Sequence, residues 1–189
     1  MTEVTSDAMM TCGPLPTVAD SPSGVTLSNA ISLAELRLDA FEAALLSPLR
    51  HFTICLRRPE SQAWQLAYCT ASERWGDTFG LAVANALFKV IRCLHDLRAE
   101  TYQGLDALDL ETRNLVTADE AAFLRMLHHM RRDETAPARD AVADLTGGWM
   151  DPHVIRAALS FAHRFPAGKA KPQHGALQST PYHGLRVVG

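Results

Sequence analysis

Positive charge is scarce in this sequence of 189 residues, and the first 30 residues contain no lysine or arginine. The 18 lysines and arginines of the chain are outnumbered by 21 aspartates and glutamates, which gives a net charge of −3. Proteins that coat DNA or RNA usually carry a basic excess. The composition therefore argues against nucleic acid as a partner.

Motifs for phosphate binding and covalent catalysis are also absent. The sequence contains neither glycine-rich phosphate loop, G-x-G-x-x-G or G-x-x-x-x-G-K-[ST], and no G-x-S-x-G nucleophile elbow. Its eight histidines include no His-x-x-x-His or Glu-x-x-His pair, the spacings that place two metal ligands on one helix face. His129 and Asp133 come closest, but we expect Asp133 to lie in a turn. We therefore predict no metal, no cofactor and no catalytic residue, which favours a non-catalytic protein over an enzyme.

Cysteines are few, and none of the four belongs to a C-x-x-C motif. The N-terminus has no basic region before an apolar stretch, which is the mark of a secretory signal peptide. The most apolar segment, residues 79–91, is shorter than the roughly 20 residues that span a bilayer. These absences predict a cytoplasmic protein with reduced thiols and no membrane partner.

The segment 79–91 is also the most informative feature that the sequence does contain. Its only strongly polar residues are Asn85 and Lys89. A helix that is apolar on nearly every face is buried on all sides in a soluble protein. We expect residues 79–97 to form the central helix and the least exposed element, with Gly80 as a point of close backbone approach.

Capping signals divide much of the remaining chain into helices. Ser32 with Glu35, and Thr117 with Glu120, have the S/T-x-x-E spacing of a capping box at a helix N-terminus. The first box predicts a helix that runs to the break at Ser47–Pro48, and the second predicts a helix with one apolar face.

Residues 49–70 allow two interpretations. A β-hairpin is one of them, because apolar residues alternate on both sides of a turn at 57–60. Helices are favoured, because a long apolar stripe recurs at positions i, i+4, i+7 and i+11: Trp64, Tyr68, Ala71 and Trp75.

The fold class predicted from these signals is all-α. We expect a single-domain bundle of six or seven helices over residues 30–166, around the central helix at about 79–98. Residues 1–29 and 167–189 are rich in Pro, Gly, Ser and Thr and lack apolar periodicity, so we expect irregular or mobile arms. The second arm is a basic tail, because it has three lysines and arginines and no acidic residue.

Three groups of residues are candidates for contact with a partner or ligand. The first is the apolar pair Trp149 and Met150, which lies between paired glycines and a predicted helix cap, where large side chains rarely reach the core. The second is a basic helix end that could bind an anion: His128, His129, Arg131 and Arg132. The third would supply the polar groups of a pocket between helices: Asn85, Arg92, His95 and Asp96.

The function favoured by these observations is a non-catalytic regulator or adaptor that acts through protein–protein contacts. Small residues on helix faces and the lack of catalytic motifs favour self-association, with a homodimer preferred, and allow a second protein partner. A small-ligand sensor or an enzyme with a pocket between helices is the alternative. A nucleic-acid-associated regulator is a weaker one because of the charge balance.

Overall fold

The computed structural model describes residues 30–98 and 102–168 of the chain. Within these ranges it contains seven α-helices, two short 3-10 helices and one pair of two-residue strands. The predicted all-α fold class is therefore confirmed. The predicted arms, residues 1–29 and 167–189, lie outside the described residues except for 167 and 168.

The first part of the described chain contains short elements. Strand β1 (Ile31–Ser32) pairs antiparallel with β2 (Leu115–Val116), and it leads into the 3-10 helix η2 (Leu33–Leu36) and helix α1 (Ala40–Ala44). The sequence predicted one helix here, but the chain turns at Arg37, which has a left-handed φ of 51°. This prediction is wrong because a second capping box starts a new helix two residues later.

One half of the bundle consists of three consecutive helices: α2 (Leu46–Arg57), α3 (Trp64–Trp75) and α4 (Asp77–Arg98). A 3-10 turn, η3 (Pro59–Ser61), joins the first two. The hairpin interpretation of residues 49–70 is thus excluded, and the helical one is confirmed. The stripe on α3 is only partly interior, because Trp64 is 46% exposed.

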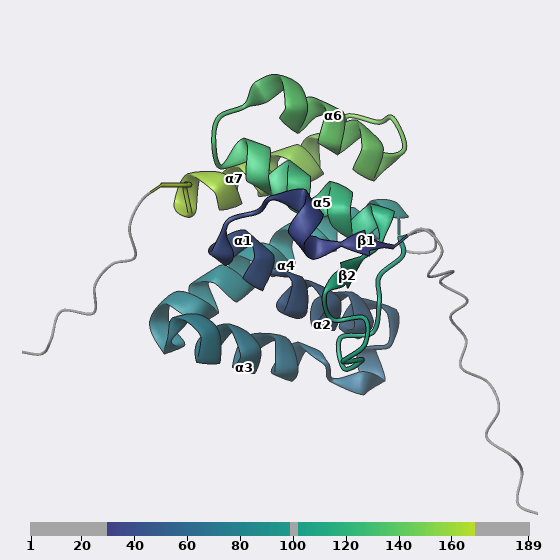
Figure 1. The fold of residues 1–189 in the computed structure, drawn as a ribbon, viewed down its shortest axis with the longest axis vertical. Helices are drawn as coiled ribbons and strands as arrows, with labels where there is room; N and C mark the ends of the chain where they lie inside the picture. Colours follow the sequence, from purple (N-terminus) through teal and green to yellow (C-terminus); the bar gives the residue numbers. More distant parts are fainter. Residues whose placement is uncertain (1–29, 99–101, 169–189) are drawn as a thin grey trace, which may run out of the picture.

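The other half consists of α5 (Ala118–Met130), α6 (Thr135–Thr146) and α7 (Pro152–Arg164). Figure 1 shows α6 at one end of the molecule and α3 at the other, with α5 between them. Contacts between α4 and α7 join the two halves, so the described residues share one hydrophobic core.

The long helix α4 is amphipathic. Seven of its residues are buried, whereas Asn85, Lys89, Arg92 and Asp96 form an exposed stripe. Its 22 residues are long and apolar enough to cross a membrane by length and composition, but its apolar face packs on α2, α3 and α7 as in a core helix.

The least exposed long helix is α5, in which eight of 13 residues are buried. The prediction that residues 79–97 would be the least exposed element is therefore wrong. The reason is position: α5 packs against α1, α6 and α7, whereas one side of α4 faces solvent.

Close packing of α3 on α4 depends on Gly80, as predicted. A Cβ atom built on Gly80 would lie 2.3 Å from the carbonyl oxygen of Ala71 and 2.8 Å from the backbone nitrogen of Ser72. Real Cβ atoms do not approach backbone atoms so closely, so any larger residue must push α3 away.

We predict that Gly80→Ala lowers the free energy of unfolding by about 2 kcal/mol or more, because overpacking outweighs the gain of about 1 kcal/mol in helix propensity. Urea denaturation measures the change. Asn85→Ala is the matched control, since it alters an exposed position of the same helix and is expected to stay within about 0.5 kcal/mol of wild type. Equal stability of Gly80→Ala and wild type would contradict the close approach of α3 and α4.

Candidate functional site

Two glutamates that are completely shielded from solvent organise the interior of the protein. The first, Glu120, completes the predicted capping box of α5: its N–H donates to Thr117 Oγ1 at 3.1 Å, and its Oε2 accepts from the Thr117 N–H at 3.0 Å. Arg50 of α2 binds both carboxylate oxygens, Nε to Oε1 at 2.8 Å and Nη2 to Oε2 at 3.0 Å. Bidentate pairs of this kind are among the stronger hydrogen bonds in proteins.

The same pair fixes the irregular segment before α5. Arg50 also donates to the carbonyl oxygens of Thr112 and Leu115, and Glu120 Oε1 accepts from the Leu105 N–H at 3.2 Å. Hydrogen bonds to this buried ion pair thus help to hold the irregular residues 102–114 that precede the short strand β2. A buried charge that is paired and fully hydrogen-bonded avoids most of the cost of its desolvation.

The second buried glutamate, Glu42, has the same position in the capping box of α1. Its N–H donates to Asp39 Oδ1 at 2.8 Å, and its Oε2 accepts from the Asp39 N–H at 3.0 Å. Arg131 and Arg132, at the end of α5, both donate to Glu42 Oε1, and His128 Nδ1 donates to Oε2 at 2.7 Å. This cluster attaches α1 to the C-terminal end of α5.

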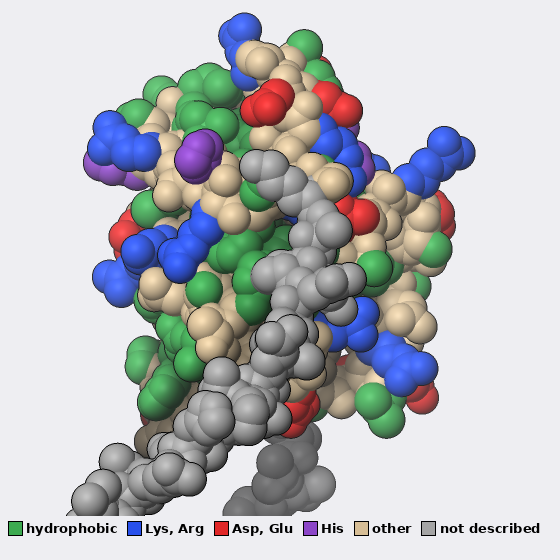
Figure 2. Space-filling view, turned by 90° about the vertical axis from the view of Figure 1, so that its left-hand side faces the viewer, with side chains coloured by type: hydrophobic (Ala, Val, Ile, Leu, Met, Phe, Trp, Pro, Cys, Tyr) green, Lys and Arg blue, Asp and Glu red, His purple; other side chains and the backbone are tan. Residues whose placement is uncertain are grey.

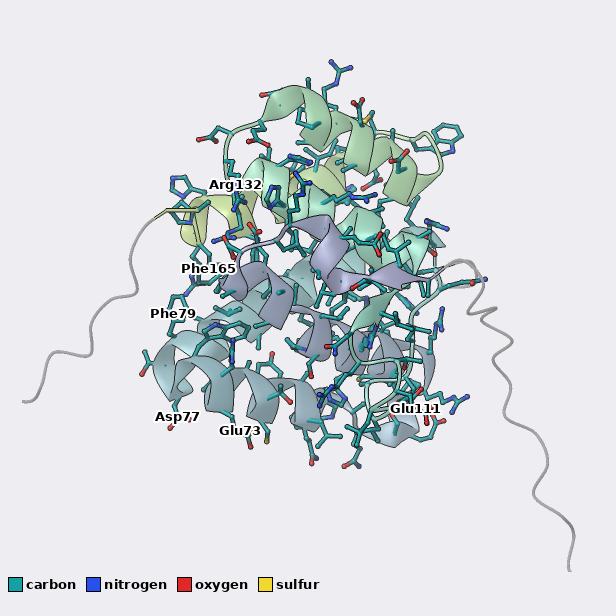
Figure 3. All side chains as sticks on the ribbon, in the orientation of Figure 1. Glu73, Asp77, Phe79, Glu111, Arg132 and Phe165 are labelled. Atoms are coloured by element: carbon teal, nitrogen blue, oxygen red, sulfur yellow. The ribbon has the colours of Figure 1, made fainter. Side chains whose placement is uncertain are left out.

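Arg131 extends the cluster to the end of α7. Its Nε donates to the carbonyl oxygen of Phe165 at 2.6 Å, and its guanidinium carbon lies 4.6 Å from the centre of the Phe41 ring. Phe165 also packs edge-on against Phe79 of α4, with ring centroids 5.5 Å apart. Figure 3 shows Arg132, Phe165 and Phe79 on one side of the molecule.

The four basic residues predicted to bind an anion thus have carboxylate partners within the chain. Asp39 and Glu42 pair with the two arginines, Glu42 also accepts from His128, and Glu134 Oε2 lies 2.6 Å from His129 Nδ1. Burial alone would raise the pKa of Glu42, but hydrogen bonds from Arg132 and His128 lower it below the ordinary value of 4.5. Anion binding stays a prediction that this geometry does not favour.

The loop between α6 and α7 presents an apolar pair to solvent. Gly147 ends α6 with a left-handed φ of 68°, and the Asp151 side chain caps α7 by accepting from the first backbone N–H groups of that helix. Between these two fixed points Trp149 is 74% exposed and Met150 is 44% exposed. The short connection leaves no length of chain for Trp149 to fold back into the core.

An apolar groove of about 180 Å³ lies next to this pair, between α6 and α7. Apolar side chains make up most of its lining: Met130, Ala138, Val142, Met150, Ile155 and Leu159. Charged side chains of both signs, Arg139, Asp133 and Glu134, also border it. Figure 2 shows hydrophobic side chains gathered at the upper left of the visible face, at the height of α6 in Figure 1.

The four polar residues predicted to line a single pocket do not converge. Asn85, Arg92 and Asp96 lie on the exposed stripe of α4, and Arg92 Nε donates to Asp96 Oδ1 at 3.0 Å. His95 instead borders a cavity of about 10 Å³ next to Tyr102, which is too small for a ligand. Arg92 and Asp96 are the two that the structure brings together.

Arg92 also borders a broad groove of about 450 Å³ between α4 and α7. Lys89, Arg156 and His153 line the same groove, which gives it a basic character. Cys93 lies there too, but burial and the nearby carboxylates of Asp96 and Asp151 raise the pKa of its thiol. A thiol with a raised pKa is a poor nucleophile, so this groove has the chemistry of a binding surface.

Sequence reasoning missed the second buried glutamate and the pairing of both with arginines. The segment Asp39-Ala40-Phe41-Glu42 has the D-x-x-E spacing of a capping box, so the local signal was present. Arg50 gave a weaker signal, as a charged residue in the apolar middle of α2. The oppositely charged partners of Arg50 and Glu42 lie at least 70 residues away in the chain.

Comparisons with known proteins give no further guide to the site: no family model, no curated protein and no solved structure matches the chain.

We predict that Glu42→Gln lowers the free energy of unfolding at pH 7 by about 3 kcal/mol, because it removes the fully buried one of the two carboxylates with which Arg131 and Arg132 pair. The pKa of Glu42 is lowered in the folded chain, so its carboxylate stabilises the fold at neutral pH. That stabilisation is lost as the pH falls through the lowered pKa. The free energies of unfolding of wild type and variant, measured by denaturant titration, should therefore become more similar below about pH 4.

Glu35→Gln is the matched control for this measurement. Glu35 has the same capping-box position at the start of η2 but is exposed, so we expect a change within about 0.5 kcal/mol. An equal decrease in the free energy of unfolding for Glu35→Gln and Glu42→Gln would contradict the role of the buried cluster. A decrease for Glu42→Gln that does not change with pH would also contradict it.

Proposed function

We propose that this protein is a non-catalytic helical interaction module that associates with a second copy of itself through α6, α7 and the loop between them. The observation that carries the proposal is a strongly exposed tryptophan whose neighbour in the chain, Met150, lines an apolar groove. An exposed apolar patch of this kind often marks an interaction site, and buried tryptophans are the most frequent anchors of protein interfaces.

The choice of a second copy follows from the geometry of the patch. In a twofold dimer each subunit offers the same surface to the other, so that surface must contain both a protruding group and the cavity that receives it. Trp149 is strongly exposed, and its neighbour Met150 lines a groove together with Ile155 and Leu159. Arg139 and Glu134 at the groove give opposite charges that could pair across the twofold axis.

The loop supports the proposal because it is fixed before any partner arrives. Thr146 Oγ1 donates to the carbonyl oxygen of Val142 at 2.7 Å and also contacts the carbonyl oxygen of Trp149, and Asp151 caps the next helix. A loop whose backbone is already ordered loses less conformational entropy on association than one that must order on binding. Such pre-ordering favours an anchor role for Trp149.

We predict that Trp149→Ala raises the dimer dissociation constant by at least about 30-fold, which corresponds to the 2 kcal/mol typical of an interface anchor. Leu159→Asp, which places a charge in the groove, should weaken the dimer at least as much. Sedimentation velocity across a concentration series measures both, and circular dichroism checks that the variants are folded.

Trp64→Ala is the matched control, because Trp64 is an exposed tryptophan on α3 at the other end of the bundle. It should associate like wild type. Monomeric wild-type protein at all concentrations would contradict self-association, and equal effects of the two tryptophan substitutions would contradict the assignment to this face.

The basic groove between α4 and α7 favours a second candidate function, the binding of a small anionic ligand. Lys89, Arg92 and Arg156 border it together, and a cleft lined by one sign of charge concentrates ligands of the opposite sign. Native mass spectrometry of the purified protein distinguishes the two candidates. A mass that exceeds the mass of one chain by that of a small molecule supports the ligand. A mass of two chains supports the dimer.

A further inference from the structure

Three potential metal ligands meet where α5 ends and α6 begins. His128 and His129 form the last turn of α5, and Glu134 is the residue just before α6. One ligand atom from each of them lies within 4.8 Å of the other two. Sequence spacing pointed to His129 with Asp133, but the chain reverses at Asp133, with φ 58°, and brings Glu134 to His129 instead.

The separation of these atoms suits a small divalent ion. Three points within 4.8 Å of one another fit in a circle of about 2.8 Å radius, and zinc takes nitrogen and carboxylate ligands at about 2.0–2.2 Å. Side-chain rotations that move each atom by less than about 1 Å would close the site. All three side chains are partly or fully accessible to solvent, so an ion can reach them.

A buried carboxylate already orients the first histidine. His128 Nδ1 donates to Glu42 Oε2 at 2.7 Å, and Glu42 is itself fixed by two arginines. This hydrogen bond places the proton on Nδ1 and leaves the lone pair of Nε2 free for a metal. Histidine ligands in metal sites almost always have such a partner, which fixes the tautomer and the direction of the ring.

The charges around the cluster also favour a cation. Asp39 and Glu42 balance Arg131 and Arg132, with which they are paired. The Glu134 carboxylate adds a further negative group, which lies directly beside the His129 ring. Imidazole and carboxylate together are ligands for zinc and the neighbouring first-row metals rather than for calcium or magnesium.

We propose that His128, His129 and Glu134 bind one divalent transition-metal ion, with Zn²⁺ as the first probe. Three protein ligands leave a fourth position for water, as in open sites whose ligands exchange, whereas closed structural sites use four protein ligands. The proposal does not rest on self-association, since its three ligands lie outside the loop that contains Trp149, but Glu134 also borders the apolar groove of the proposed interface.

Zinc titration of the full-length protein at neutral pH, in competition with a chromogenic chelator, tests the proposal. We expect one ion per chain, and at least about tenfold weaker binding in each of His129→Ala and Glu134→Gln, since even loss of an outer-shell partner costs 10–100-fold. Co²⁺ should give strong visible absorption in wild type that both variants lose. Trp149→Ala should keep the wild-type affinity.

His163→Ala is the matched control, because His163 is exposed on α7 and lies outside the cluster. It should bind zinc like wild type. Absence of one-to-one binding in the wild type would overturn the proposal. Undiminished binding in folded His129→Ala and Glu134→Gln would also overturn it, because the ion would then be held elsewhere in the chain.

Discussion

The pairing of two buried glutamates with arginines from distant helices is the interaction on which the rest of this structure depends. A carboxylate without solvent contact is tolerated only when hydrogen bonds and an opposite charge replace the lost water. Glu120 obtains them from Arg50 and its own capping box, and Glu42 obtains them from Arg131 and Arg132. In both cases the start of a helix and a long-range contact share the same side chain, so neither forms fully without the other.

This arrangement also explains where the candidate sites lie. The N-terminal end of α5 is fixed by one glutamate and its C-terminal end by the other. Between them α5 is the most buried long helix and packs against both α6 and α7. The apolar groove and the histidine cluster are thus supported by the rigid C-terminal end of α5. A site whose backbone is held in this way needs only side-chain movement to bind a ligand, which lowers the cost of binding.

The sequence was informative where a signal was local. The helical stripe on α3, the small residue at Gly80, the capping box at Thr117 and the glycine-ended α6 could all be predicted, because each depends on neighbours within a few turns. The break at Arg37 was missed because the D-x-x-E box after it was not recognised.

Features set by tertiary structure could not be predicted from local patterns. The exposed stripe of α4 was not predicted: Lys89 was treated as an exception within an apolar run, whereas Asn85, Arg92 and Asp96 were expected to line a pocket. The meeting of His128 with Glu42 joins residues 86 positions apart. The approach of Glu134 to His129 depends on one left-handed residue after the helix end. Neither of these two contacts has the i, i+3 or i, i+4 spacing that identifies metal sites within a helix.

A double-mutant cycle between Arg50 and Glu120 tests the dependence on buried pairs most directly. Arg50→Met and Glu120→Gln should each lower the free energy of unfolding by about 3–5 kcal/mol, because each leaves a buried group without its partner. The double variant should lose much less than the sum, with a coupling energy of about 2–3 kcal/mol by urea denaturation. Losses that add to within about 0.5 kcal/mol would show that the two side chains act independently and would contradict the account.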